Sequence, residues 1–370
     1  MTAATPPHDL VGIGIGPFNL SLAALAHPVP GLRAAFLEAE PRFSWHPGMM
    51  IDGATLQVPF LADLVTLVDP TSRHSYLAHL RDTERLFGFY FAEQLHVPRS
   101  EYEAYCAAVA ARLDSCRFGT RVTEVDRTTL PDGGDGFVVR FAEDGDGRST
   151  RSACSTLTTA NLVLGIGTAP TVPAPLVHLT EKPDALASHS AHYLEHAADL
   201  RTADDITVIG SGQSGAEIVL DLLRTRHRPG RRLRWLTRSA AFEPMEYSKL
   251  GLEHFTPDYI DHFHALPEER RNTLLSGQGR LYKAVSTDTL AAIRAELDAR
   301  AFPDGIASTG MTLMPGAEVR DGRRSGDSLT LTVHHRQTDS TFTLTTDRLV
   351  LATGYAPRHP DFLEIGRAHV

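Results

Sequence analysis

The chain has 370 residues, of which 42% are hydrophobic and 22% charged, a composition typical of a globular protein with two or more packed domains. Its formal net charge of −9 provides no electrostatic basis for binding nucleic acid or an anionic membrane. Three cysteines, Cys106, Cys116 and Cys154, have neither metal-ligand nor CxxC spacing, so we expect no metal site and no disulfide framework, which fits a reducing cytoplasm.

The chain begins without a basic segment. Its first apolar run, residues 10–15, is interrupted by glycines and is too short to span a bilayer. We therefore expect neither a signal peptide nor a membrane anchor. The run predicts a short buried strand that ends in a glycine turn and leads into an apolar helix.

This glycine turn predicts a first dinucleotide-binding loop. Gly12 allows a tight turn, and Gly14 lets the backbone approach a pyrophosphate at the positive end of the following helix. Pro17 stands where the usual motif has its third glycine, and proline costs little in a first helical turn. A second strand, residues 34–37, leads to an acid suited to ribose hydroxyls. The residues expected to bind the nucleotide are Gly12, Gly14, Gly16, Pro17 and Glu38. The alternative is a turn that only reverses the chain.

The same pattern recurs at residues 205–217, where a strand, a glycine loop and an apolar helix predict a second dinucleotide site. The next strand, residues 233–236, is followed by Arg238 instead of an acid. A guanidinium suits a 2′-phosphate and so favours NADPH over NADH, although Arg238 could also be a solvated surface residue. The residues expected to bind this nucleotide are Gly210, Gly212, Gln213, Ser214, Gly215 and Arg238.

Two more strand–turn segments, residues 161–168 and 349–355, are expected where the chain passes between two nucleotide domains. The alternative is that they are only buried parallel strands. Residues 243–300 mix aromatic and charged side chains and end in a predicted helix over 287–299, which indicates a small helical insertion. The glycine-rich stretches 133–136 and 144–147 are predicted to be polar turns between strands.

The most specific segment follows the second predicted strand. It contains the runs FSWHPGM at 43–49, LQVPFLADLVT at 56–66 and DPTS at 69–72. In these runs the chain resembles the flavin-dependent N-hydroxylating monooxygenases of hydroxamate siderophore biosynthesis, the lysine and ornithine N-monooxygenases, and the resemblance covers nearly the whole chain. It implies that Trp45, His46 and Gln57 lie close to the isoalloxazine of FAD. The alternatives are a core aromatic, a capping histidine and a surface amide.

The resemblance implies an α/β protein with two Rossmann-like dinucleotide-binding domains, for FAD and NADPH, the second inserted in the first. The expected ranges are 1–170 with 350–370 for the FAD domain, 171–242 with 301–349 for the NADPH domain, and 243–300 for a helical substrate-binding insertion. Disulfide reductases share this order of folds, but they need a redox-active CxxC beside the flavin, which is missing. Baeyer–Villiger-type monooxygenases carry a different sequence between the two motifs, so that class is disfavoured.

The activity that the resemblance implies needs no protein acid, base or nucleophile: NADPH reduces FAD, the flavin captures O2 as a C4a-hydroperoxide, and a neutral amine attacks it.

In lysine and ornithine hydroxylases a lysine and an asparagine hold the amino-acid end of the substrate. The aligned residues here, Ala62 and Leu252, cannot make those bonds. We therefore hypothesise that the substrate is an aliphatic diamine such as cadaverine or putrescine. The candidate acceptors for its distal ammonium are Glu243, Glu246 and Glu253; the alternative for each is a solvated helix face.

Lysine N6- or ornithine N5-hydroxylation is the close alternative to diamine hydroxylation. A nucleotide-binding fragment without turnover and an NADPH oxidase are alternatives of other kinds.

The resemblance also implies a homo-oligomer. Family members continue beyond the point where this chain ends, and its last residues, 364–370, match the translation of a common sequencing-adapter oligonucleotide, so we hypothesise a truncated flavin domain.

Overall fold

The computed structural model describes residues 6–143, 154–225 and 230–363 and divides into two compact units. The first unit comprises Met1–Trp45, Gly53–Ala169 and Ala356–Val370, and the second comprises His46–Asp52 and Pro170–Tyr355. The chain passes between them in two short strands that pair with each other, β7 Thr168–Pro170 and β16 Tyr355–Pro357. The turn predicted at 144–147 and the tail at 364–370 lie outside the described residues.

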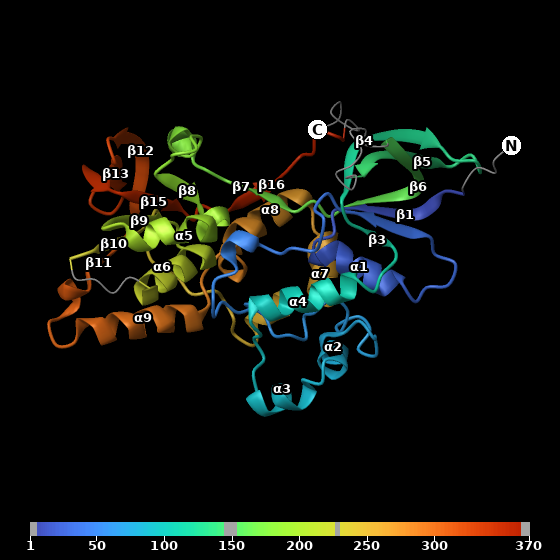
Figure 1. Cartoon of the computed structure of the whole chain (residues 1–370), viewed down its shortest axis with the longest axis horizontal. Coiled ribbons are helices and arrows are strands. Elements are labelled where there is room, and N and C mark those ends of the chain that lie inside the picture. The colour runs from blue at the N-terminus through green and yellow to red at the C-terminus, as the bar shows by residue number, and fades with distance from the viewer. Residues whose placement is uncertain (1–5, 144–153, 226–229, 364–370) are drawn as a thin grey trace. The chain divides into compact units, whose positions relative to one another are not determined.

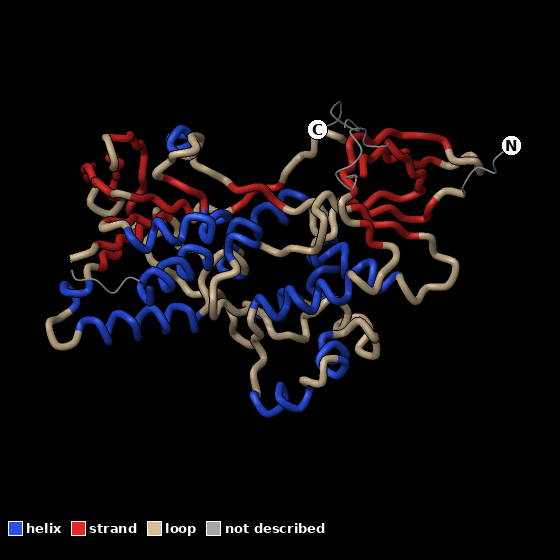
Figure 2. Tube along the Cα trace, in the orientation of Figure 1, coloured by secondary structure: helices blue, strands red, loops and turns tan. Residues whose placement is uncertain are grey.

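The first unit contains, among its described residues, a six-stranded sheet in the order β3-β2-β1-β6-β5-β4 (Figures 1 and 2). Its strands are β1 His8–Ile13, β2 Ala34–Leu37, β3 Cys116–Arg117, β4 Thr120–Thr129, β5 Asp135–Glu143 and β6 Cys154–Leu164. Its helices are α1 Pro17–Ala26, α2 Tyr76–Asp82, α3 Leu86–Ala92 and α4 Arg99–Ala110. Strands β3, β2, β1 and β6 run parallel, and β5 and β4 continue antiparallel. The predicted strand, glycine turn, helix and strand are confirmed.

Both faces of the central strands of this sheet are covered. Val11 and Leu37 pack into one cluster with Phe141 of β5, whereas Phe36 packs into another with Leu20 of α1. A strand that is buried on both faces has apolar residues in succession rather than in alternation. This explains why a plain hydrophobic run, rather than a period of two, predicts β1 and β2.

The second unit contains a five-stranded parallel sheet, within the residues described, in the order β11-β10-β9-β15-β8. Its strands are β8 Ala187–His189, β9 Asp205–Ile209, β10 Arg232–Thr237, β11 Met311–Pro315 and β15 Arg348–Leu351. Helices α5 Tyr193–Thr202 and α6 Gln213–Thr225 follow β8 and β9. An antiparallel sheet is formed by β12 Ala317–Ser325, β13 Ser328–His335 and β14 Ser340–Thr346.

In both parallel sheets the strand order reverses beside the first strand of the nucleotide motif. Strand β1 lies between β2 and β6, and β9 lies between β10 and β15. Ligands of open α/β sheets bind at the carboxyl ends of strands at such a reversal. The predicted α/β class with two Rossmann-like sheets is therefore confirmed, and each glycine loop follows the strand at this position.

Residues 243–300 belong to the second unit and are mainly helical. Their helices are α7 Pro257–Ala265, α8 Glu268–Gly277 and α9 Thr287–Ala301, with short 3-10 turns η4 Gly251–Phe255 and η5 Gly279–Leu281. Helix α9 lies along α6 (Figure 1). The helix predicted over 287–299 is thus confirmed and extends two residues further.

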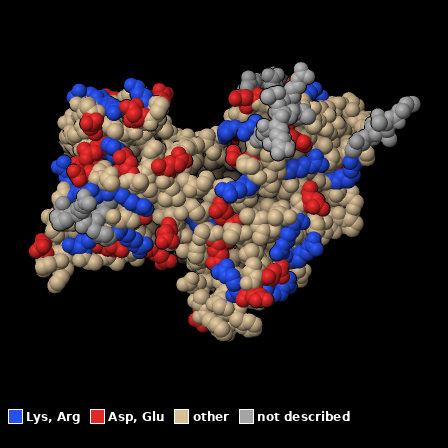
Figure 3. Space-filling view, in the orientation of Figure 1, with Lys and Arg blue, Asp and Glu red and all other residues tan. Residues whose placement is uncertain are grey.

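The surface charge of each unit is mixed. On the face in Figure 3, acidic and basic side chains alternate over both units without a large area of one sign. None of the helices in the described ranges combines the length and the apolar character needed to cross a bilayer.

A buried ion pair lies at the start of β9. Asp205, whose side chain is only 5% exposed, accepts from Arg234, whose side chain is 12% exposed, and pairs with Arg232 at 2.8 Å. The hydroxyl of Thr346 also donates to the backbone carbonyl of Asp205 at 3.2 Å. These contacts tie β9 to β10 and to the end of β14.

Replacing Asp205 with alanine would leave the Arg234 guanidinium buried and unpaired. We expect Asp205→Ala to lower the free energy of unfolding by about 3–5 kcal/mol, measured by urea denaturation. The neighbouring Asp204, whose side chain is 83% exposed, pairs with Arg231 at 3.3 Å and is the matched control. Asp204→Ala should cost no more than about 1 kcal/mol, and equal losses for both variants would contradict the prediction.

Candidate active site

The first glycine loop is held by a backbone contact that excludes any side chain. Gly14 has a positive φ of 85°, and a Cβ built on it would lie 2.5 Å from the carbonyl oxygen of Gly165. Gly165 directly follows β6, so this contact brings the carboxyl ends of β1 and β6 together. A Cβ on Gly12 would lie 2.3 Å from the Phe36 ring, whereas one on Gly16 would have only ordinary contacts. Packing therefore excludes a side chain at Gly12 and Gly14, whereas the position of Gly16 has room for one.

A buried asparagine that the sequence analysis missed locks this loop. The amide of Asn19 donates to the carbonyl oxygens of Gly14 at 2.8 Å and Ile13 at 3.3 Å. Asn19 is 2% exposed and also fills the space beside Gly165. The available signal was a polar residue in the first turn of an apolar helix, two residues after Pro17.

The acid at the end of β2 also contacts the loop. Glu38 accepts through Oε2 from the backbone N–H of Ile15 at 2.8 Å and through Oε1 from that of Glu40 at 3.0 Å. Its carboxylate is thus held at the mouth of the glycine loop. Each oxygen keeps further acceptor capacity for a ribose hydroxyl.

The three residues expected beside the flavin divide between the units. In the first unit, Trp45 is half-buried, its ring lies 5.1 Å from that of Tyr102, and its backbone N–H donates to Glu103; Gln57 is half-buried in an irregular segment. In the second unit, His46 is exposed with a left-handed backbone, and its ring centroid lies 6.5 Å from that of Tyr355.

The second glycine loop repeats the backbone contact of the first. Gly210 has φ of 117°, and a Cβ on it would lie 2.0 Å from the carbonyl oxygen of Ala352, directly after β15. A Cβ on Gly215 would lie 2.3 Å from the carbonyl oxygen of Gly210, so helix α6 packs closely on the loop. Nothing lies within 4 Å of a Cβ built on Gly212. This glycine leaves open space where a ligand can approach the backbone.

Two side chains support this loop in ways that the sequence pattern did not indicate. Trp235 is 1% exposed, and its indole N–H donates to the carbonyl oxygen of Gly210 at 2.7 Å. The Gln213 amide donates to Glu217 and to Thr289 at the start of α9, and its oxygen accepts from the backbone N–H of Ser286 at 2.9 Å. Gln213 thus links the loop to α9. Ser214 is half-buried beside it.

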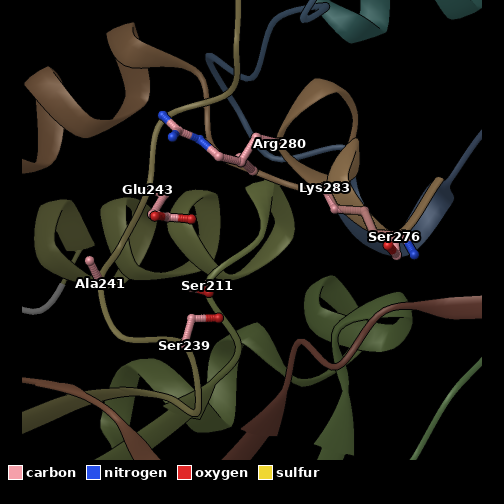
Figure 4. A pocket seen from close by; sticks show the side chains of 10 residues that line it. Ser211, Ser239, Ala241, Glu243, Ser276, Arg280 and Lys283 are labelled. Carbon is pink, nitrogen blue, oxygen red and sulfur yellow. The ribbon is translucent and has the colours of Figure 1, made fainter. Parts of the chain in front are cut away.

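A pocket of about 240 Å³ lies next to this loop (Figure 4). Ser211 of the loop and Ser239, two residues after β10, contribute to its lining, together with residues of the helical insertion. Arg238 is exposed and is not among the residues that line the pocket.

The residues expected near the substrate lie in irregular segments. Ala62 is exposed in a turn of the first unit, where the neighbouring Asp63 accepts from the backbone N–H groups of Val65, Thr66 and Tyr76. That carboxylate therefore shapes the turn, a role that the sequence analysis did not assign.

The other substrate candidates belong to the second unit. Leu252 is half-buried in η4, and the adjacent Glu253 is exposed. Glu246 accepts from the backbone N–H of Ser248 at 2.9 Å, and hydrogen bonds from the Ser248 hydroxyl and backbone hold the pKa of Glu246 below its usual value. Glu243 lines the pocket beside the glycine loop.

The comparisons with known proteins agree with this architecture. The model of the L-lysine 6-monooxygenase/L-ornithine 5-monooxygenase family matches residues 6–357, and the chain belongs to this family.

Individual relatives span nearly all of the chain. It is 40% identical over 360 residues to a putrescine N-hydroxylase of Shewanella oneidensis, covering 96% of this chain and 69% of that protein. The crystal structure of DfoA bound to FAD, the cadaverine monooxygenase of the desferrioxamine pathway from Erwinia amylovora, matches with a TM-score of 0.89 and 38% identity over 97% of this chain and 80% of that one. An ornithine N-hydroxylase of Kutzneria sp. 744, with FADred, NADP+ and L-orn, matches with a TM-score of 0.85 and 27% identity over 98% and 84%.

Removing the Asn19 amide would take the side-chain donor from the Gly14 carbonyl and one of the two donors from the Ile13 carbonyl, which keeps the Gly165 N–H at 2.8 Å. We expect Asn19→Ala to lower the free energy of unfolding by about 1–3 kcal/mol in urea denaturation. Asn161 is an exposed asparagine of the same unit that also donates to a backbone carbonyl, that of Asp9 at 2.9 Å. Asn161→Ala should cost less than about 1 kcal/mol; a loss as large as that of Asn19→Ala would argue against a special role for Asn19.

The two glycines of the second loop should respond in opposite ways to alanine. Gly210→Ala would drive a methyl group into the Ala352 carbonyl at a positive φ, so we expect the melting temperature to fall by several degrees or more. Gly212→Ala adds a methyl group to open space and should leave the melting temperature nearly unchanged. A Gly210→Ala protein that melted like the wild type would contradict the packing described above.

Proposed function

We propose that the protein is a FAD- and NADPH-dependent N-monooxygenase that hydroxylates the terminal amine of an aliphatic diamine, cadaverine or putrescine, for hydroxamate siderophore biosynthesis. The observation that carries this proposal is the similarity, over almost the whole chain, to a putrescine N-hydroxylase and to a cadaverine monooxygenase. The substrates are the amine and O2, and we place the protein in the cytoplasm, as a homo-oligomer.

The loop of the first unit fits the pyrophosphate and ribose of FAD. The open backbone at Gly16, the positive end of α1 and the held carboxylate of Glu38 are the groups that such a nucleotide requires. We assign Gly12, Gly14, Gly16, Pro17 and Glu38 to FAD, with Trp45, His46 and Gln57 beside its ring. Ranges 1–170 and 350–370 form the proposed FAD domain.

The loop of the second unit fits NADPH. The space outside Gly212 admits a pyrophosphate, and the strand that follows leads to an arginine rather than an acid. We assign Gly210, Gly212, Gln213, Ser214, Gly215 and Arg238 to this nucleotide. Gln213 contributes by fixing the loop on α9, because its side chain already binds the start of that helix. Ranges 171–242 and 301–349 form the proposed NADPH domain, and 243–300 the substrate insertion.

FAD, once reduced by NADPH, supplies the activated oxygen for this reaction. The protein must bind the amine in its neutral form, although a free alkylammonium has a pKa of about 10.4. A pocket that excludes water favours the neutral form, so no side chain is needed as acid or base. The chain's contribution is to orient the amine and to hold the opposite end of the substrate.

The end of the substrate opposite the reacting amine should be an ammonium, not the amino-acid end of lysine or ornithine. Losing a charge-assisted partner for a carboxylate costs about 1.5–3 kcal/mol, and both Ala62 and Leu252 lack a polar group. Of the candidate acceptors, Glu246 is engaged by Ser248, and Glu243 shares its pocket with cations. Glu253 is exposed and makes no side-chain hydrogen bond or ion pair within the described part of the chain, so we assign the distal ammonium to it.

The proposal predicts which amine is hydroxylated. With FAD and NADPH, the purified protein should form hydroxylamine from cadaverine or putrescine with a kcat/KM about ten- to a hundredfold above that for lysine or ornithine. A higher kcat/KM for an amino acid would identify lysine or ornithine as the substrate instead of the diamine, and the family activity would stand. NADPH consumption that does not depend on amine would indicate an oxidase, and no consumption would indicate a binding protein.

The role of Glu253 can be tested in the same assay. Glu253→Gln should raise the KM for the diamine about tenfold, because one charge-assisted contact is lost. Glu268 is an exposed glutamate of α8 and serves as the control; Glu268→Gln should leave the KM unchanged. An unchanged KM in Glu253→Gln would move the ammonium site to another residue.

A further inference from the structure

Two histidines of the first unit face each other at the end of α1. His27 caps the end of α1, and His74 lies in the turn that leads into α2. Their ring centroids lie 5.2 Å apart at an interplanar angle of 85°, and Nδ1 of His27 lies 3.5 Å from Nε2 of His74. His27 is exposed, whereas His74 is only 2% exposed. Two rings that can each take up a proton therefore fasten the turn to α1.

The hydrogen bonds around this pair fix where its protons lie. The Arg73 guanidinium lies 3.4 Å from Nε2 of His27, and because a guanidinium only donates, this nitrogen accepts. The proton of neutral His27 is therefore on Nδ1 and is donated to Nε2 of His74. The proton of His74 is then on Nδ1, which is buried and has no hydrogen-bond partner among the described residues.

An additional proton on either ring disrupts this arrangement. Protonated His74 would carry an N–H on both nitrogens, and its Nε2–H would point at the Nδ1–H of His27. Protonated His27 would direct a second N–H at the Arg73 guanidinium. Each protonation therefore replaces a hydrogen bond with a contact between two donors and places a positive charge beside a cation.

The surroundings of His74 act in the same direction. Its charged and titratable neighbours are Arg73 beside it, His27 on α1 and Arg112 beyond the end of α4, of which Arg112 also pairs with Asp82 at 3.0 Å. Burial, followed by the charges of these three neighbours, lowers the pKa of His74 from 6.5 to about 4. His74 is therefore neutral in the folded protein at pH values where a free histidine is largely protonated.

We propose that His27 and His74 form a pH-sensitive switch, which holds residues 69–75 on α1 at neutral pH and releases them in acid. The switch lies within the first unit and needs neither a bound nucleotide nor the amine.

Residues 69–75 are connected to the turn over 62–66, where the family resemblance places the substrate. The backbone N–H of Tyr76 donates at 2.6 Å to the Asp63 carboxylate, which shapes that turn. The Ser21 hydroxyl of α1 donates to a backbone carbonyl of the same turn. Releasing residues 69–75 removes one of the contacts that hold this part of the chain on α1, so its backbone hydrogen bonds should open more often in acid.

The pH range of the switch follows from the two states of His74. When residues 69–75 are released, the pKa of His74 returns to its ordinary value of 6.5. The released state then binds more protons than the closed state between pH 6.5 and about 4. Falling pH therefore favours release over this range, and the closed state has its full stability only above it.

Amide hydrogen exchange, measured by mass spectrometry on the full chain with FAD, tests the switch. Protection of residues 60–76 would be compared at about pH 7.5 and about pH 5, corrected for the intrinsic exchange rate at each pH. In the wild type, protection should fall about tenfold or more in acid. In His74→Gln the side-chain oxygen can accept from His27 but cannot take up a proton, so protection should change little.

Two further variants test the switch without altering the buried ring. His27→Gln changes an exposed residue, and its side-chain oxygen can accept from protonated His74, so the fall in protection should become smaller. Arg73→Leu removes the neighbouring positive charge, which makes protonation of the closed state easier, and should also reduce the fall. Melting temperatures at neutral pH would show that each variant is folded, and these two variants decide the question if His74→Gln is not.

Two other histidines serve as references. His262 is an exposed histidine of α7, and His262→Gln should show the full wild-type response. His79 is the competing source: it is buried, its Nδ1 also lacks a partner within the described ranges, and burial lowers its pKa. A response that persisted in His74→Gln and disappeared in His79→Gln would overturn the proposal. Equal protection of the wild type at both pH values, or an equal fall in the wild type, His74→Gln and His27→Gln, would overturn it as well.

Discussion

The close approach of two backbones at the end of each parallel sheet is the constraint on which the rest of the structure depends. In the first unit the Gly14 backbone meets the Gly165 carbonyl, and in the second unit the Gly210 backbone meets the Ala352 carbonyl. Both contacts join neighbouring strands where the strand order reverses, and neither leaves room for a Cβ. In each unit the strand ends therefore pack tightly, and the helix that follows the glycine loop can present its N-terminus to a phosphate.

The parts of the fold that the sequence predicts are those that local patterns encode. The strand, glycine loop and helix in each unit follow from a buried apolar run, glycines at fixed spacing and helical periodicity. The supports of these loops are different, because they join residues that are distant in the chain. Trp235 reaches a carbonyl 25 residues earlier, and no local pattern indicates that its indole rather than a neighbouring side chain would do so. Asn19 is near in sequence, but its role becomes visible only once Gly165 is placed beside it.

The candidate site was predictable to a similar extent. Motif spacing identified the glycines, and resemblance to a family identified the segment with Trp45 and Gln57. Gln213 was expected to contact the nucleotide, yet its amide binds the start of α9, more than 70 residues later. The direction of a side chain in a loop depends on the residues that pack against that loop, and a sequence motif carries no information about them. The same limit applies to Asp63, whose carboxylate caps the turn that the family resemblance associates with the substrate.

The charges of the second unit restrict where an amine can bind. A diamine carries one ammonium at its distal end throughout the reaction. The pocket lined by Arg280, Lys283 and a single carboxylate repels this charge. Glu243 shares its pocket with these two cations and is therefore less suited than the exposed Glu253 to holding the substrate. Within the helical insertion, η4, which carries Leu252 and Glu253, is the part that we propose for the amine.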